Sequence, residues 1–136
     1  RMDRAASIAA QRHSRNICVT ASVNHVAFTK AIPLGSVVTV EAKVSRSFNS
    51  SMEIFIDVWI EDRSSGNKTK TMEAIYTFVA VDATGKPVEV PPIIPQTELE
   101  QQRYDAALRR KQLSLVLAGK MKPSDATELK ALFIGE

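Results

Sequence analysis

The ionisable side chain best placed to do chemistry is that of Asp3, at the start of a predicted helix over residues 2–13. Four alanines favour this helix, and small residues on one face would let it lie close to a sheet. A carboxylate there can act as a general base toward water or can itself attack a carbonyl carbon. It can also simply stabilise the positive end of the helix dipole, and the pattern alone favours that simpler role.

Hydroxyl and basic side chains form a second set of candidates. Thr20 and Ser22 lie on the polar side of a predicted strand, where they could contact a ligand or simply satisfy groups at a sheet edge. Arginine side chains match the geometry of phosphate groups. Basic residues that could bind phosphate are Arg46, Arg103, Arg109, Arg110 and Lys111. Because charged runs usually form a solvated face, these residues are also consistent with no binding role.

Other kinds of site find no support in the sequence. The two histidines, His13 and His25, form no metal-binding motif, and no G-x-S-x-G or nucleic-acid-binding motif occurs. We therefore expect no metal and no nucleic-acid partner. The net charge of +3 and the charged content of 24% are ordinary for a globular protein, and no apolar run predicts a membrane partner. The single cysteine, Cys18, cannot form an internal disulfide, which fits a cytoplasmic location.

Alternating apolar and polar residues predict strands over residues 17–28, 37–45, 52–61 and 69–81. In the first strand, the alternation places Ile17, Val19, Ala21 and Val23 on one face. The apolar phase then changes near residues 24–25, which indicates a bulge. Turn-forming residues mark positions 33–35 and a hairpin loop over residues 64–67.

The connections between residues 37 and 81 are of hairpin length, which favours an antiparallel meander. A helix over one face of that sheet makes a two-layer α+β domain. Because the sheet edges and the second face still need cover, we expect the domain to dimerise.

A second helix begins at a capping box formed by Thr97 and Glu100, and we expect it to end near residue 118 with Gly119 as its stop. A short last helix is predicted over residues 124–133. These boundaries predict a core domain over residues 1–96 and a C-terminal helical extension over residues 97–136.

Several separated segments follow one another along the chain in a characteristic order. They are TASVNHVAFTKAIP at residues 20–33, SSMEI at 50–54, YTFVAVD at 76–82 and GKP at 85–87, with Pro91 after them. This series resembles the hotdog-fold acyl-CoA hydrolases, the acyl-CoA thioesterase family, over roughly residues 2–111. The resemblance implies a curved antiparallel sheet around a long helix, with the C-terminal helices as an extension.

The resemblance also implies a reaction, the hydrolysis of acyl-CoA to free fatty acid and coenzyme A. Asp3 stands where the family carries its catalytic carboxylate, so its expected role becomes that of general base or nucleophile. Backbone N–H groups at a helix N-terminus would stabilise the oxyanion. Coenzyme A enters as part of the substrate and product, and no separate cofactor is expected.

By the same resemblance, Ser50 and Ser51 lie beside the active site across a dimer interface, where they could hold the attacking water or bind the pantetheine arm. The remaining substrate contacts that we expect are Thr20, Arg46, Arg109 and Arg110. Family members pair edge to edge as homodimers, with active sites at the interface, and often assemble further into hexamers as trimers of dimers.

One departure from the family matters. The family carries, upstream of the catalytic acid, a first strand and a glycine-containing loop, and this sequence, which starts at Arg1 inside a predicted helix, does not contain them. We therefore expect that residues are missing before Arg1 and that the chain alone is inactive. An alternative function is a non-catalytic acyl-CoA-binding or regulatory hotdog module. A hotdog dehydratase is a weaker alternative, because its histidine-bearing motif is not found.

Overall fold

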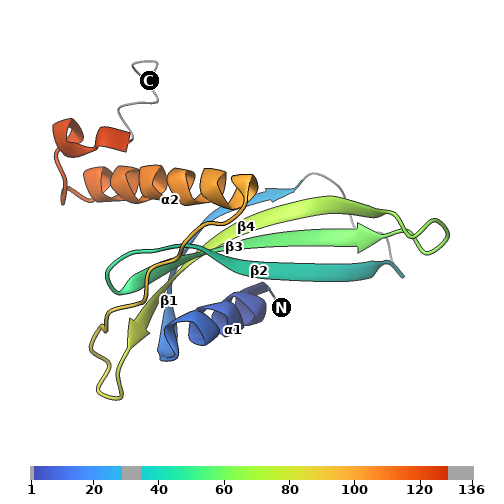
Figure 1. The fold of residues 1–136 in the computed structure, drawn as a ribbon, viewed down its shortest axis with the longest axis horizontal. Helices are drawn as coiled ribbons and strands as arrows, with labels where there is room; N and C mark the ends of the chain where they lie inside the picture. The colour runs from blue at the N-terminus through green and yellow to red at the C-terminus, as the bar shows by residue number, and fades with distance from the viewer. Residues whose placement is uncertain (1, 29–34, 129–136) are drawn as a thin grey trace. The chain divides into compact units, whose positions relative to one another are not determined.

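The computed structural model describes residues 2–28 and 35–128 (Figure 1). Contacts divide the chain into two units, Arg1–Ile93 and Ile94–Glu136. The first holds helix α1 and four strands, and the second holds helix α2 and a short 3-10 helix, η1. In chain order the elements are α1 (Met2–Ser14), β1 (Ile17–Phe28), β2 (Val37–Ser47), β3 (Ser51–Glu61), β4 (Lys68–Val81), α2 (Glu98–Leu117) and η1 (Pro123–Asp125).

The predicted helices and strands are all present, with bounds that differ by at most two residues, except for the last helix. In its place the structure has η1, and the predicted continuation beyond residue 128 lies outside the described residues. The predicted turn at residues 33–34 and the side chain of His25 also lie outside them.

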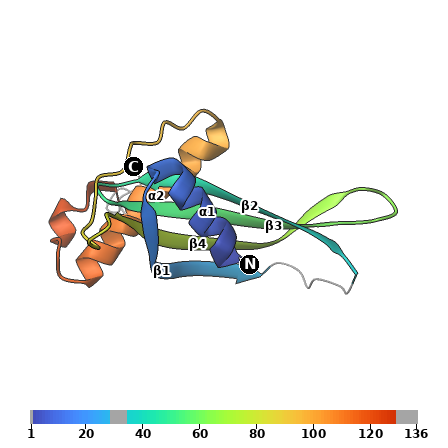
Figure 2. The ribbon, with the colours of Figure 1, turned by 90° about the horizontal axis from the view of Figure 1, so that it is seen from below.

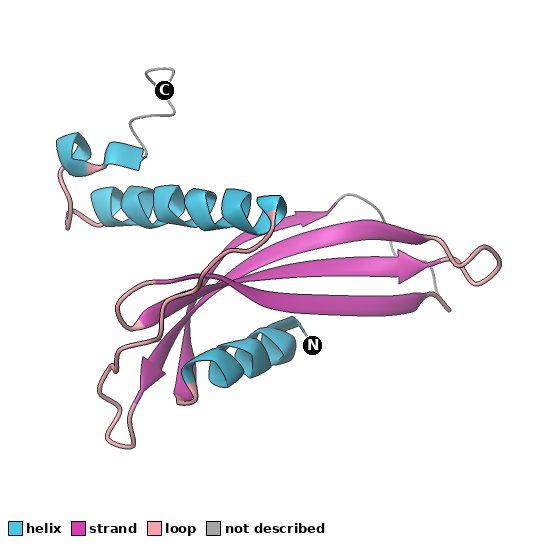
Figure 3. Ribbon diagram, viewed as in Figure 1, coloured by secondary structure: helices cyan, strands magenta, loops and turns pink. Residues whose placement is uncertain are grey.

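The four strands form one antiparallel sheet in the order β1-β4-β3-β2 (Figure 3). The predicted meander is confirmed for β2, β3 and β4. Strand β1 does not join β2 but pairs with β4, so β4 is central, which explains why the second half of its sequence is apolar on both faces.

Strand β1 contains two register shifts, one between Val23 and His25 and one between Thr20 and Ser22. The first confirms the predicted bulge, and the second was not predicted. Side chains opposite each other in a ladder share a face, so Thr20, opposite Phe78, lies on the face that α1 covers, and Ser22, opposite Thr77, lies on the other. The expectation that Thr20 and Ser22 share one side is therefore wrong.

The register shift between Thr20 and Ser22 also corrects a second expectation about β1. Val23 lies opposite Tyr76, on the face that α1 covers, whereas Ile17 and Val19 lie on the other face. The expected apolar face through Val23 is therefore broken, because the extra residue at the bulge reverses the alternation after it.

Helix α1 packs on the sheet through its small side chains. Ala6 and Ala10 are both 0% exposed. The apolar face of β3 packs with them, together with apolar residues from β4, in a cluster that includes Met52, Ile54, Ile56, Val58, Met72, Ala74, Tyr76, Phe78 and Ala80. Alanine lets the helix backbone approach the sheet closely, as the sequence predicted.

The other face of the sheet carries a charged cluster around Lys70. Its Nζ lies 2.9 Å from Asp57 Oδ1 and 2.6 Å from Glu73 Oε2. It also lies 5.4 Å from the centre of the Trp59 ring. Burial acts to lower the pKa of Lys70, but the hydrogen bonds to Glu73 and Asp57 and their negative charges outweigh it, so the pKa is raised.

In the second unit, α2 has a side-chain cap at its start and a glycine stop at its end. The Thr97 hydroxyl oxygen accepts a hydrogen bond from the N–H of Glu100 (3.0 Å), as the predicted capping box requires. After the helix, Gly119 adopts a φ of 73°, and the N–H of Lys120 donates to the carbonyl oxygen of Leu115 (2.8 Å). This is a Schellman motif, which a left-handed glycine favours.

The packing of α1 predicts that Ala10→Leu will destabilise the first unit. The added carbons have no space beneath the helix, so we expect a loss of about 1–3 kcal/mol in the free energy of unfolding, measured by urea denaturation. Gln11→Leu, on the exposed side of the same turn, is the matched control and should change it by about 0.5 kcal/mol or less. Equal effects of the two variants would contradict the close helix–sheet contact.

The charged cluster predicts a pH-dependent contribution of Lys70. Because the folded pKa of Lys70 is raised, its contribution is fully present below the unfolded pKa, about 10.4, and is lost as the pH rises through the folded pKa. The difference in unfolding free energy between wild type and Lys70→Met should therefore be constant from neutral pH to about 9 and shrink above about 10.4. Lys68→Met, at an exposed position of β4, is the control. A difference that grows at high pH would contradict the assignment.

Candidate functional site

The first turn of α1 carries the exposed side chain of Asp3, whose Oδ1 accepts a hydrogen bond from the N–H of Arg4 (3.0 Å). Figure 2 shows this end of the helix on the side of the sheet where β1 and β4 lie. Met2, the neighbour of Asp3, packs against the core cluster. The helix therefore fixes the position of its first turn while the Asp3 carboxylate stays accessible.

Tyr76 on β4 is a second ionisable side chain on the face of the sheet that α1 covers. Its side chain is buried, and its ring stacks on Phe78 with centroids 6.2 Å apart. Burial raises the pKa of Tyr76, and the negative charge of Asp3 raises it further. The sequence indicated Tyr76 only as part of a family-like segment.

Thr20 lies in the same region of the sheet. It is exposed on edge strand β1, opposite Phe78 and on the face that α1 covers. Val23, further along β1, lies opposite Tyr76. Thr20 and Tyr76 therefore lie on the same face of the sheet, on the neighbouring strands β1 and β4, and α1 covers that face.

Ser50, Ser51 and Arg46 lie elsewhere in the same chain. Ser51 is opposite Val79, whose neighbours in β4 point toward α1, so Ser51 faces the other side of the sheet. It is 9% exposed, and Ser50 is half-buried in the loop before β3. Arg46 pairs with Glu53 on that other side. A single protomer therefore does not bring these residues together with Asp3.

The other two expected substrate contacts belong to the second unit. Arg109 and Arg110 are half-buried on α2. Their role in binding substrate stays a prediction.

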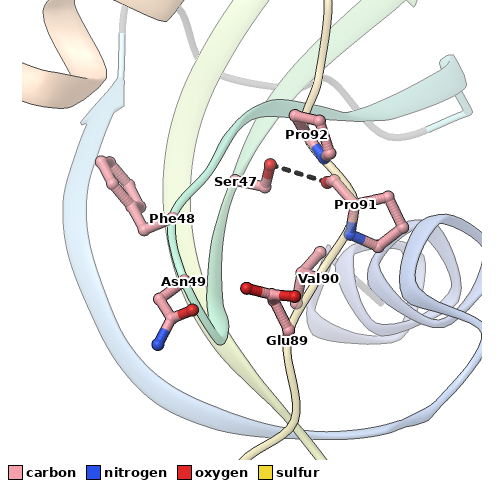
Figure 4. Close-up of a pocket in the computed structure, with 7 residues that line it drawn as sticks. All are labelled: Ser47, Phe48, Asn49, Glu89, Val90, Pro91 and Pro92. Carbon is pink, nitrogen blue, oxygen red and sulfur yellow. Dashed lines mark hydrogen bonds between the residues drawn. The ribbon is translucent and has the colours of Figure 1, made fainter.

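Near the other end of α1, a pocket of about 450 Å³ opens beside the loop between β2 and β3 (Figure 4). Its residues are Ser47, Phe48, Asn49, Glu89, Val90, Pro91 and Pro92. The Pro91 carbonyl oxygen accepts hydrogen bonds from Ser47 Oγ (2.8 Å) and His13 Nε2 (2.7 Å). Since a carbonyl oxygen only accepts, His13 Nε2 must carry the proton, and this histidine has a structural contact.

A second hollow, of about 540 Å³, lies between α1 and β2 and is lined mainly by apolar side chains, with Arg12, His13 and Lys43 among them. Neither hollow is lined by Asp3, Thr20 or Tyr76.

Within residues 2–28 and 35–128, no three His, Cys, Asp or Glu side chains gather in a way that could hold a metal ion. None of the helices described in the structure has the length and the hydropathy that crossing a membrane requires.

Comparison with known proteins identifies relatives of this chain. The model of the thioesterase superfamily matches residues 2–66. Acyl-coenzyme A thioesterase 11 of Mus musculus is 40% identical over 121 residues, which is 89% of this chain but only 20% of the mouse protein. The chain therefore spans about a fifth of that relative.

Two solved structures are similar over most of their length. An apo hexameric acyl-CoA thioesterase superposes with a TM-score of 0.80 at 35% identity, over 85% of this chain and 74% of that one. An acyl-CoA hydrolase from Staphylococcus aureus, in complex with butyryl coenzyme A, coenzyme A and coenzyme A disulfide, gives a TM-score of 0.81 at 29% identity, over 98% and 78%. Two variants of the latter enzyme have alanine in place of an aspartate and of a threonine seventeen positions later.

Proposed function

This chain belongs to the hotdog-fold acyl-CoA thioesterase family, and from that membership we propose that the protein hydrolyses acyl-CoA thioesters to free fatty acid and coenzyme A. The observation that carries the proposal is the exposed carboxylate of Asp3 on the first turn of α1. An acyl-CoA thioester is activated toward water, so a positioned carboxylate and an oxyanion site are sufficient chemistry.

In the proposed mechanism, Asp3 acts as general base or as nucleophile. As a base it takes a proton from water while the water oxygen bonds to the thioester carbonyl carbon; the C–S bond then breaks, and the coenzyme A thiolate leaves and takes up a proton. As a nucleophile the carboxylate forms an acyl anhydride, which water then hydrolyses. In both routes N–H groups at the N-terminus of α1 would stabilise the oxyanion.

The Staphylococcus aureus variants support the choice of Asp3 and Thr20. The aspartate and the threonine replaced in that enzyme are seventeen positions apart, as Asp3 and Thr20 are in this chain. We propose that Thr20 contacts the substrate or the attacking water beside Asp3. Its place on the face that α1 covers supports this assignment.

The coenzyme A part of the substrate needs contacts further from the thioester. We propose that Ser50 and Ser51 bind the pantetheine arm of a substrate held by the partner protomer. We propose that Arg46, Arg109 and Arg110 bind its phosphates. Guanidinium groups suit that role because they form paired hydrogen bonds to phosphate oxygens.

We propose that the protein forms a homodimer through β1 and that three dimers form a hexamer. Ile17 and Val19 on this edge strand are 63% and 50% exposed, which is unusual for apolar side chains of a strand in a single protomer. The similar apo thioesterase structure is hexameric. A reducing compartment suits the free thiol of Cys18, and we propose a cytoplasmic location.

The proposed mechanism predicts that Asp3→Asn in the full-length protein will lower kcat by about 10²–10⁴-fold, because the amide can neither accept the proton nor attack. Thiol release from short to long acyl-CoAs measures the effect. Glu98→Gln removes the same charge from the first turn of α2 and should leave kcat unchanged. Saturable acyl-CoA binding without thiol release in the wild type, or full activity of Asp3→Asn, would contradict the proposal.

Isotope labelling tests the nucleophilic route. A single turnover in water enriched in ¹⁸O places label in the Asp3 carboxylate if Asp3 is the nucleophile and water attacks its Cγ in the anhydride, whereas attack at the acyl carbon, like the general-base route, places the label in the fatty acid. Mass spectrometry of the peptide containing Asp3 reads the result.

The proposed assembly predicts that Val19→Lys will break the dimer, because it places a charge on an edge that must be buried. Light scattering should show a halved mass for the dimer unit, and thioesterase activity should fall with it. The control is Val38→Lys. Val38 lies on β2 at the opposite edge of the sheet, and its exposure of 45% is close to the 50% of Val19. If Val38→Lys dissociates the dimer and Val19→Lys does not, the interface is at the β2 edge and the proposed interface at β1 is wrong.

A further inference from the structure

We propose that the hollow between α1 and β2 is a second binding site, which takes a free fatty acid. Its carboxylate lies near Arg12 and Lys43, and its alkyl chain lies along the apolar wall. The choice of ligand rests on the proposed function, since hydrolysis of acyl-CoA releases this class of molecule. The volume of the hollow, about 540 Å³, is ordinary for a small-molecule site.

Apolar side chains from two elements form the wall of the hollow. Helix α1 contributes Ala5, Ile8 and Ala9, and strand β2 contributes Val40 and Val44. Ile8 is 45% exposed and the other four are half-buried, so the wall leaves apolar surface in contact with water. Along α1 the lining runs from residue 5 to residue 13, a rise of about 12 Å. A wall of this length suits an extended alkyl chain.

The basic side chains of the lining lie toward one end of the hollow. The carbonyl oxygen of Pro91 accepts hydrogen bonds from both His13 and Ser47. The last turn of α1 therefore lies beside the end of β2. Arg12 belongs to that last turn and Lys43 to the second half of β2, so two long cationic side chains can reach the same ligand group.

These two cations have no partner of opposite charge in the described part of the chain. Within residues 2–28 and 35–128, neither Arg12 nor Lys43 makes a salt bridge or a side-chain hydrogen bond. The described residues that line the hollow include no carboxylate. Arg12 also complements the negative end of the dipole of α1, but Lys43, on a strand, has no such role.

An apolar wall with unpaired cations matches a ligand that has an alkyl chain and a single negative head group. A carboxylate accepts hydrogen bonds from both guanidinium and ammonium groups, and these charge-assisted bonds are stronger than neutral ones. The alkyl chain removes apolar surface from water, and each methylene group that it buries should strengthen binding about fourfold. A free fatty acid supplies both parts.

Photolabelling of the full-length protein locates the ligand. Laurate that carries a diazirine in its chain should label the peptides that contain residues 5–9 and 40–44, and unmodified laurate should prevent the labelling. Mass spectrometry identifies the labelled peptides. If a second protomer or another part of the full-length protein covers the hollow, these peptides will carry no label, and the proposal is wrong.

The double variant Arg12→Gln, Lys43→Gln tests the head group. The concentration of laurate that halves the labelling should rise roughly tenfold, because two exposed charge pairs are lost. Methyl laurate, which has no charge, should compete equally well in variant and wild type. Arg63→Gln, Lys68→Gln removes the same two charges from exposed positions at the β3–β4 hairpin and is the matched control. Equal weakening in both double variants would contradict a specific carboxylate site.

Chain length tests the apolar wall. Decanoate should compete more strongly than octanoate, by about fourfold for each added methylene group that the hollow buries. Equal competition by the two acids would show that the chain stays in water, and the proposed wall would be wrong.

A last pair of measurements separates this site from the proposed reaction. Asp3 does not line the hollow, so Asp3→Asn saturated with acyl-CoA should still be labelled. Loss of label there would show that the hollow holds the acyl chain of the substrate, and a second site would be excluded. Thiol release by a wild type that is not labelled would overturn the site alone. Labelling of a wild type that releases no thiol would overturn the hydrolysis and leave the site.

Discussion

The close approach of α1 to the sheet is the constraint on which the site depends. Ala6 and Ala10 leave no side-chain layer between the helix backbone and the strands beneath. The small volume of these alanines sets the distance between the helix and the sheet. The length of the helix sets where on the sheet its first turn lies. Asp3, on that first turn, is positioned by the same packing, because its neighbour Met2 contacts the core cluster. Alanine in α1 therefore does more than favour helix formation, since it also places the carboxylate.

Much of this fold follows from local patterns in the sequence. Strict alternation in β3 identified the residues that face the helix, and Thr97 with Glu100 identified the start of α2. The family and its hotdog fold, expected from separated segments, are confirmed by the comparisons. The pairing of β1 with β4 was not predictable, because it joins strands far apart in the sequence and depends on tertiary packing.

The candidate site was less predictable than the fold, for a physical reason. An acid in a first helical turn interacts with the helix dipole whether or not it has another role, so the sequence of α1 alone could not distinguish the two. The register shift between Thr20 and Ser22 adds one residue to β1, which leaves Thr20 on the face of α1 and moves Ser22 to the other. That shift has no clear mark in the alternation of apolar and polar residues.

The position of Thr20 on the edge strand explains why catalysis and assembly should depend on each other. Thr20 lies on β1, the strand whose apolar side chains Ile17 and Val19 are exposed in one protomer, and the end of α1 that carries Asp3 is on the side of the sheet where β1 and β4 lie (Figure 2). An exposed carboxylate is strongly hydrated. This hydration weakens both its basicity toward the attacking water and its attraction to nearby hydrogen-bond donors. A second protomer against β1 would bury the apolar side chains and exclude water from the polar ones in the same step. The strand that stabilises the dimer would then also create the low-dielectric environment that the Asp3 carboxylate needs.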